Sequence, residues 1–224
     1  MISEVYNIDC MIGMAEYPDN YFDLAVIDPP YGIGINKQSQ GKGGGVAKKN
    51  EYVKKTWDND APNPEYFDLL VRKSKHQIIW GANHFIDNFP FMSNSPCWIV
   101  WDKDNGGTDF ADAELAWTSF NTAVRIFKWK WSGMLQQNMK HKETRIHPTQ
   151  KPVALYKWLL KNYAKEGDTI LDTHLGSSSS RIAAHDMGFD FTGYEIDADY
   201  FKASELRFNN HIQQQSLFKP KEMY

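Results

Sequence analysis

The chain has 224 residues, of which 42% are hydrophobic, which is enough for one sizeable α/β domain with a full core. Its formal net charge of −3 argues against a uniformly basic nucleic-acid-binding protein. The two cysteines, Cys10 and Cys97, are far apart and form no CxxC motif, so the sequence predicts neither a disulfide framework nor a metal site and favours a reducing cytoplasm.

The chain is expected to open with a strand over Val5–Ile8 that ends at Asp9 and Cys10, followed by a short helix. Asp9 is either the N-cap of that helix or a ligand contact, and the local sequence does not distinguish the two.

The tetrapeptide Asp28-Pro29-Pro30-Tyr31 directly follows the apolar run 24–27, which predicts a buried strand. Each proline fixes its own φ and lacks an N–H, so the loop should be rigid. The Asp28 carboxylate and the two proline carbonyls are then fixed acceptors, which suits a substrate with an exocyclic amino group, and Tyr31 offers a flat face for a base. A simple proline turn at a strand end is the alternative.

Positive charge is concentrated in two segments. Residues 36–55 carry six lysines against one glutamate, and residues 125–145 carry six cations against one glutamate. Such segments on an acidic body are typical of phosphate-contacting elements, although an ordinary solvated charge run is the alternative for either one. The candidate nucleic-acid contacts are Lys37, Lys42, Lys48, Lys49, Lys54 and Lys55 in the first segment and Lys128 and Lys130 in the second.

The middle of the chain alternates between irregular and regular stretches. Residues 32–59 are rich in Gly, Lys and Gln without periodicity, which predicts a long mobile basic loop of functional use. A helix over 63–73 and strands over 77–80, 97–101 and 114–120 are expected next. Residues 127–131 alternate aromatic residues with lysines, so they either stack on bases beside phosphates or form a half-buried strand. The longest uncharged run, Asn88 to Trp101, is shorter than a membrane span, so no membrane-spanning segment is expected.

The last third predicts a βαβα unit, with helices over 152–164, 178–187 and 198–210 and strands over 169–172 and 190–195. This pattern indicates a largely parallel sheet with its ligand at the carboxyl ends of the strands. Four carboxylates, Asp9, Asp28, Asp172 and Glu195, lie at such ends, which favours a polyhydroxyl or amine ligand. The glycine and hydroxyl loop 173–180 opens a helix and can bind an anion through its N–H groups. Glu195 has the usual position of a ribose-binding acid.

Three motifs, in this order, carry a family resemblance. They are Asp28-Pro29-Pro30-Tyr31, then His147-Pro148-Thr149-Gln150-Lys151-Pro152, then Leu171-Asp172 with Gly176-Ser177 and Gly193-Tyr194-Glu195-Ile196-Asp197. Together they resemble the amino-methylating DNA methyltransferases of the permuted β group, in which the catalytic tetrapeptide precedes the cofactor loop. The resemblance covers nearly the whole chain. It implies a single α/β domain over 1–224 with a Rossmann-like S-adenosylmethionine-dependent methyltransferase fold, a seven-stranded mostly parallel sheet and a circularly permuted motif order.

The resemblance also implies the partners and the site. S-adenosylmethionine would be the methyl donor and DNA the substrate, with no metal or membrane involved, while a homodimer is left open. Asp28, Pro29, Pro30 and Tyr31 would be catalytic. Asp9 and Cys10 would hold the cofactor adenine and Glu195 its ribose. The methionine end would be lined by His147, Thr149, Gln150, Lys151, Asp172, Gly176 and Ser177, and Asp28, Ser178 and Ile196 complete the expected cofactor set.

The chemistry of the tetrapeptide suits methyl transfer to an exocyclic amine, and the resemblance favours adenine as the target base. The N6 lone pair of adenine is delocalised, so N–H bonds held by the Asp28 carboxylate and the Pro29 carbonyl would bias the nitrogen toward a tetrahedral geometry that faces the methyl group. A base in a duplex must be flipped out to reach such a pocket. Aspartate at the first motif position favours adenine N6 over cytosine N4, for which the family more often has serine. Cytosine N4 transfer and a catalytically silent methyltransferase-like subunit are the alternatives, whereas Ser178 disfavours a dinucleotide-binding oxidoreductase.

The cofactor loop departs from the family pattern Asp-Pro-Phe-x-Gly-Ser-Gly. Thr173 and His174 replace the Pro and Phe, and Ser178 replaces the second Gly. Either Ser178 keeps the family path and is strained, or the loop is re-routed and the Ser178 hydroxyl caps the helix. Four successive serines, residues 177–180, favour the capping alternative.

The first basic segment can be tested directly. Replacing Lys48, Lys49, Lys54 and Lys55 by Gln should weaken DNA binding and flatten its dependence on salt by about one unit of slope for each lost phosphate contact. Binding measured by fluorescence anisotropy over a salt series checks this. An unchanged slope would mean that these lysines only keep the segment soluble.

Overall fold

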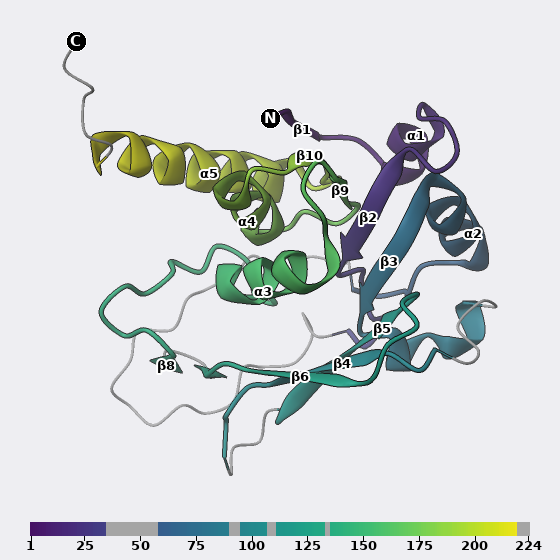
Figure 1. Ribbon diagram of the computed structural model, residues 1–224, viewed down its shortest axis with the longest axis horizontal. Helices are drawn as coiled ribbons and strands as arrows, with labels where there is room; N and C mark the ends of the chain where they lie inside the picture. Colours follow the sequence, from purple (N-terminus) through teal and green to yellow (C-terminus); the bar gives the residue numbers. More distant parts are fainter. Residues whose placement is uncertain (35–57, 90–94, 107–110, 133–134, 219–224) are drawn as a thin grey trace.

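The fold is that of a computed structural model, which describes residues 1–34, 58–89, 95–106, 111–132 and 135–218. Eight strands form one sheet in the described part of the chain (Figure 1). Their spatial order is β1 (Ser3–Tyr6), β10 (Asp190–Tyr194), β9 (Thr169–Asp172), β2 (Phe22–Ile27), β3 (Ser74–Trp80), β5 (Ala113–Thr118), β4 (Trp98–Asp102) and β6 (Arg125–Lys128). Each strand is parallel to its neighbours except β5, which is antiparallel to β3 and β4.

The mostly parallel sheet is confirmed, but the predicted number of seven strands is wrong. The eighth strand is β6, which pairs with β4 at the edge of the sheet and lies in the second basic segment, residues 125–145. Its only buried side chain is Phe127, so the apolar pattern that identifies a strand is weak there. A two-stranded ribbon of β7 (Trp131–Ser132) and β8 (Leu135–Gln136) follows it.

Helices cover both faces of the sheet (Figure 1). On one face lie α1 (Cys10–Ala15) and α2 (Pro64–Lys73), and on the other lie α3 (Val153–Tyr163) and α4 (Ser179–Met187), with α5 (Ala198–Phe218) beside α4. The last four residues of β2 alternate between two hydrophobic cores and are all buried. Leu24 and Val26 point into the core beneath α3 and α4, whereas Ala25 and Ile27 point into the core beneath α1 and α2. A strand buried on both faces reads as a continuous apolar run, which is why the sequence identified it.

The expected helices α2, α3 and α4 begin and end within one residue of their predicted bounds. The helix α5 extends eight residues beyond the predicted end at Asn210. The first strand ends at Tyr6 rather than Ile8, because Asp9 already caps α1. Most of the predicted mobile loop lies outside the described residues, but its two ends meet where the Gly34 N–H donates to the Asp58 carbonyl at 3.0 Å.

Parallel pairing brings the carboxyl ends of β1, β10, β9, β2 and β3 to one edge of the sheet. The chain leaves β3 through two short 3₁₀ helices, η2 (Ala82–His84) and η3 (Ile86–Asn88), at the same edge. The four carboxylates singled out in the sequence follow four of these strands, as predicted. Across the described ranges, no helix is both long enough and apolar enough to cross a membrane.

The core beneath α3 gives the first test of the packing. Leu155 is fully buried on α3, so Leu155→Ala should lower the free energy of unfolding by about 2 to 5 kcal/mol through lost burial and a cavity. Leu206 on α5 is 62% exposed, and Leu206→Ala should change it by less than about 0.5 kcal/mol. Urea unfolding followed by circular dichroism checks both, and equal losses would contradict the described core.

Candidate active site

The Asp28-Pro29-Pro30-Tyr31 loop is held by contacts on both sides. Asp28 ends β2 with a side chain that is 16% exposed, and the Tyr31 hydroxyl donates to its Oδ1 at 2.7 Å. The N–H groups of Tyr31 and Gly32 both donate to Oδ1 of Asp58, at 2.8 and 3.1 Å. The buried Asp58 therefore fixes the first backbone donors after the two prolines. Sequence reasoning missed Asp58, because it lies in an aperiodic stretch.

The Tyr31 ring lies against residues that follow β3. Gly81 has φ +69°, and a Cβ there would overlap the Tyr31 ring, so both conformation and space require glycine. On the neighbouring 3₁₀ turn, the exposed His84 stacks on Tyr31 with a centroid separation of 5.1 Å and an interplanar angle of 16°. The orientation of Tyr31 is thus set by the end of β3 as well as by its own loop.

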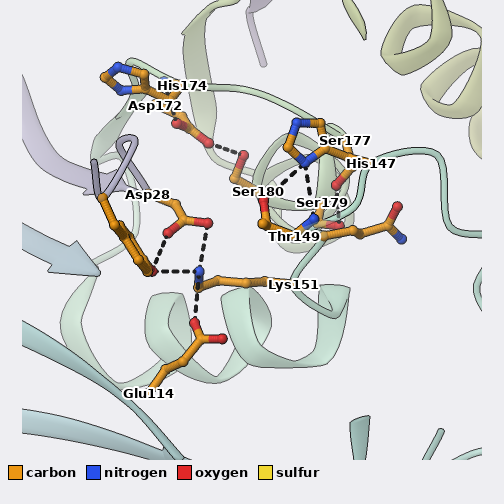
Figure 2. A network of polar contacts seen from close by, with 12 residues as sticks. Asp28, Glu114, His147, Thr149, Lys151, Asp172, His174, Ser177, Ser179 and Ser180 are labelled. Carbon is orange, nitrogen blue, oxygen red and sulfur yellow. Dashed lines mark hydrogen bonds and ion pairs between the residues drawn. The ribbon is translucent and has the colours of Figure 1, made fainter. Parts of the chain in front are cut away.

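A buried lysine joins the tetrapeptide to two other segments. The Lys151 Nζ lies 2.6 Å from Asp28 Oδ2 and 2.9 Å from Glu114 Oε2 on β5, and it donates to the Tyr31 hydroxyl at 3.1 Å. Glu114 pairs in turn with Lys103. Figure 2 shows Lys151 between Asp28 and Glu114. The structure therefore brings Lys151, which the resemblance assigned to the methionine end of the cofactor, onto the expected catalytic carboxylate.

The ionisation of this cluster follows from burial opposed by pairing. Burial raises the pKa of Asp28 above its ordinary value, and the Lys151 charge offsets part of that effect. Burial alone would lower the pKa of Lys151, but Asp28 and Glu114 together raise it. Against its own burial, Lys151 and Lys103 lower the pKa of Glu114 to about 2. Burial also raises the pKa of Tyr31, so its hydroxyl keeps the proton that it donates to Asp28.

Asp172 ends β9 and anchors the loop that follows. Its Oδ2 accepts from the Ser180 hydroxyl at 2.5 Å and its Oδ1 from the His174 N–H at 3.0 Å. Burial raises the pKa of Asp172 to about 7 despite these hydrogen bonds. Burial also lowers the pKa of His174 to about 4, so this imidazole is neutral at pH 7. Burial also raises the pKa of the Cys10 thiol to about 12, so this thiol is uncharged at pH 7.

Glu195 faces the same loop from the end of β10. Its Oε2 accepts from the Gly176 N–H at 2.8 Å and its Oε1 from the Asp197 N–H at 2.9 Å. Gly176 has φ +51°, and a Cβ there would make ordinary van der Waals contact with the His174 carbonyl oxygen at 3.8 Å, so conformation rather than space favours glycine at this position. Ile196, the residue after Glu195, is 68% exposed. Asp9 is the N-cap of α1, since its Oδ1 accepts from the Met11 N–H at 2.8 Å. This bond uses one of the two carboxylate oxygens, so the N-cap role does not exclude a ligand contact.

The segment His147–Lys151 lies beside the glycine loop (Figure 2). The His147 Nδ1 is 3.0 Å from the Thr149 hydroxyl, and its ring packs against Tyr200 with centroids 4.3 Å apart. The side chain of Gln150 braces its own loop, since it accepts from the Ile146 N–H and donates to the Thr144 carbonyl. Of the segment, His147 therefore approaches the glycine loop and Lys151 approaches Asp28, while Gln150 supports both.

The expectation that the Ser178 hydroxyl caps α4 is wrong. Ser178 is the N-cap residue, but its φ is +63°, in the left-handed region, and its side chain makes no capping hydrogen bond. Its hydroxyl is fully buried and has no hydrogen-bond partner among the described residues. The neighbouring hydroxyls are used otherwise, with Ser180 on Asp172 and Ser177 and Ser179 3.1 Å from each other. The loop keeps a path that glycine would follow without strain.

Sequence reasoning also missed a clamp behind the loop. Arg207 on α5 donates to the Ser177 carbonyl at 2.5 Å and to the Ser179 hydroxyl at 2.9 Å, and it pairs with Glu143 at 2.7 Å. Glu143 in turn accepts from the Val153 N–H at 3.0 Å, at the start of α3. These partners are far apart in the chain, and no local motif marks them.

The predicted nucleic-acid contacts are only partly described. The six lysines of the first basic segment, residues 37 to 55, lie outside the described residues. Lys128 and Lys130 are 62% and 40% exposed, and they pair with Asp104 at 2.9 and 3.5 Å. Their charge is therefore partly balanced at the surface. Among the residues that the structure describes, no group of three or more His, Cys, Asp or Glu side chains is arranged to hold a metal ion.

Comparison with known proteins identifies the family of this chain. A family model described as DNA methylase matches residues 72–206, which is more than half of the chain. The chain belongs to the DNA methylase family. It is 26% identical to the type II methyltransferase M.HinfI of Haemophilus influenzae, with 89% of this chain aligned, and it spans 66% of the length of that relative.

Two solved structures share the fold of this DNA methylase. The M1.HpyAVI–SAM complex matches with a TM-score of 0.56 and 18% identity over 92% of this chain and 100% of that chain. The PvuII DNA methyltransferase (cytosine-N4-specific) matches with a TM-score of 0.59 and 13% identity over 100% of this chain and 89% of that chain. The likeness confirms the predicted Rossmann-like methyltransferase fold.

Ser178 gives a test of the site geometry. Ser178→Gly should raise the free energy of unfolding by about 1 to 2 kcal/mol, because it relieves a positive φ and removes a buried hydroxyl without a partner. Ser178→Ala is the matched control, since it removes the hydroxyl but keeps the Cβ at positive φ, and it should gain less. Thermal unfolding of the three proteins measures both contributions. A destabilised glycine variant would show that the hydroxyl is engaged after all.

Proposed function

We propose that this DNA methylase transfers a methyl group from S-adenosylmethionine to N6 of an adenine flipped out of DNA. The observation that carries the proposal is Asp28, a carboxylate held at the end of β2 on a loop whose next two residues have no N–H. A carboxylate there is a fixed acceptor for the hydrogens of an exocyclic amine. Aspartate at this motif position favours adenine over cytosine.

Residues at the neighbouring strand ends fit the cofactor. Glu195 is oriented by two backbone N–H groups, and a carboxylate in this position can accept hydrogen bonds from ribose hydroxyls. Gly176 has no side chain, which would allow a ligand to approach its backbone closely. We assign the adenine end to Asp9, Cys10 and Ile196, and the methionine end to the loop after Asp172 and to His147 and Thr149. When bound, S-adenosylmethionine supplies an electrophilic methyl group on a sulfonium.

The residues of the chain then act by positioning and charge complementarity. The Asp28 carboxylate accepts one amine hydrogen and the Pro29 carbonyl accepts the other, which turns the nitrogen lone pair out of the ring plane. Each Asp28 oxygen has two lone pairs, so the contacts with Tyr31 and Lys151 leave room for the amine. As the amine gains positive charge, the fixed carboxylate stabilises it. Tyr31 would supply the surface on which the base stacks, with the base taking the place of the exposed His84 on its ring.

The two basic segments complete the proposal as contacts for the DNA backbone. The lysines of residues 37 to 55 would neutralise phosphates of the DNA. Lys128 and Lys130 would do the same once phosphate replaces Asp104 as their partner. The proposal places the protein in the cytoplasm with its DNA and holds for a monomer or a homodimer.

Two other functions are possible for this fold, and analysis of the methylated product distinguishes them from adenine N6 transfer. Cytosine N4 transfer uses the same fold, as the PvuII enzyme illustrates. A catalytically silent subunit is the alternative that the strained Ser178 favours, because strain in the cofactor loop would weaken S-adenosylmethionine binding.

The test is product analysis. The purified protein, S-adenosylmethionine and genomic DNA should yield N6-methyladenine, identified by mass spectrometry of the digested nucleosides. Asp28→Ala should lower the rate of methyl transfer by about a hundredfold or more. It should also lower thermal stability, because it removes one partner of the buried Lys151, so the rates are compared at a temperature at which both proteins are folded. Asp23→Ala, at the other end of β2, is the matched control and should retain the rate. N4-methylcytosine as the product, or no methylated base with the wild-type protein, would contradict the proposal.

A further inference from the structure

Charges alternate in a row that leads away from Asp28. Asp28, Lys151, Glu114 and Lys103 pair in sequence, and their side chains are 16%, 3%, 22% and 16% exposed. A lysine as buried as Lys151 is rare unless it is paired, because desolvation of a single ammonium costs several kcal/mol. The row thus has a buried cation in the middle and the proposed amine acceptor at one end.

The position of Lys151 is fixed by its own segment. The side chain of Gln150 is bound to the backbone of Thr144 and Ile146 in the preceding part of its loop, and Pro152 directly precedes α3 with φ −70°. The Lys151 amine also lies 5.5 Å from the centroids of the Tyr31 and Trp80 rings. Both the backbone and the amine of Lys151 are therefore fixed beside Asp28, unlike those of a flexible surface lysine.

We propose that Lys151 and Glu114 are positioning residues. Lys151 keeps the Asp28 carboxylate ionised and oriented toward the amine. Glu114 holds Lys151 in place and offsets part of its positive charge. The amine of Lys151 occupies Oδ2 of Asp28, so the remaining lone pairs are oriented toward Tyr31 and the substrate. This inference rests on the proposed function for the role of Asp28 as amine acceptor. It moves Lys151 from the cofactor to the acceptor of the reaction.

Other groups also act on the Asp28 carboxylate. They are Tyr31 on its own loop, Lys151 before α3, Glu114 on β5, Tyr156 on α3 and Asp172 at the end of β9. Lys151 is the one cation among them, and the two acids oppose it. Removal of Lys151 should therefore favour the protonated, inactive form of Asp28, whereas removal of the Glu114 charge should favour the ionised form.

The two variants thus predict shifts of opposite sign, which a merely structural role would not produce. Lys151→Met should move the acidic limb of the kcat profile to higher pH by at least about one pH unit, and Glu114→Gln should move it to lower pH. Lys151→Arg keeps the charge and should retain the wild-type limb. The Kd for S-adenosylmethionine, measured by calorimetry, should change less than about threefold in Lys151→Met. Lys75→Met is the matched control, because Lys75 pairs with Asp23 at the other end of β2 at 2.6 Å.

A second readout does not depend on turnover. A carbon-13 NMR titration of aspartate-labelled protein, with the Asp28 carboxyl resonance assigned by its loss in Asp28→Asn, should show the same opposite shifts. Unchanged Asp28 titration in folded Lys151→Met and Glu114→Gln, or a much weaker cofactor Kd with an unshifted acidic limb, would overturn the inference. If Lys151→Met does not fold, Glu114→Gln alone decides by the sign of its shift. A wild-type protein without methyl transfer would contradict the proposed function, and the NMR titration would still decide the coupling.

Discussion

The shared ion pair of Lys151 with Asp28 and Glu114 is the constraint on which the site depends. It joins three segments that are distant in the chain, namely the end of β2, the strand β5 and the turn before α3. Each partner would be costly to bury alone, since an unpaired charge in a low-dielectric interior loses its hydration without compensation. The pairing therefore selects one arrangement of these segments. The same contacts hold the tetrapeptide at the edge of the sheet where the residues proposed to bind the cofactor lie.

A second set of contacts builds the neighbouring half of the site. Glu195 receives two backbone N–H groups, Asp172 receives a hydroxyl and an N–H, and Arg207 clamps the loop between them from behind. One residue of this loop, Ser178, is in a strained conformation with a buried hydroxyl that no described residue satisfies. Such strain persists only where the surroundings over-determine the backbone, and it is common at functional sites. The loop is thus shaped by its contacts with Asp172 and Arg207 more than by the preferences of its serines.

Much of the fold was predictable because local sequence patterns determine it. The buried run before Asp28, the apolar face of α3 and the βαβα order of the last third each identify their element within a few residues, and parallel strands then bring Asp28, Asp172 and Glu195 to one edge. The strand β6 was left open because only Phe127 in it is buried. Asp58, Glu114 and Arg207 could not be found in this way. The partners through which they support the site, Gly32, Lys151 and Ser177, lie 26 or more residues away, and neither spacing nor composition marks such a pair. Ser178 was misjudged because serines favour helix N-caps in general, whereas here the loop path required a positive φ.

The central claim is that Asp28, held by Lys151, is the acceptor of the target amine. The most direct measurement is a crystal structure of the protein with S-adenosylhomocysteine and a DNA duplex that it modifies. We expect the adenine N6 to lie about 3 Å from an Asp28 carboxylate oxygen, with the Lys151 amine still paired to Asp28. A flipped base whose amine is bound elsewhere, or a Lys151 that has left Asp28 for the cofactor, would contradict it.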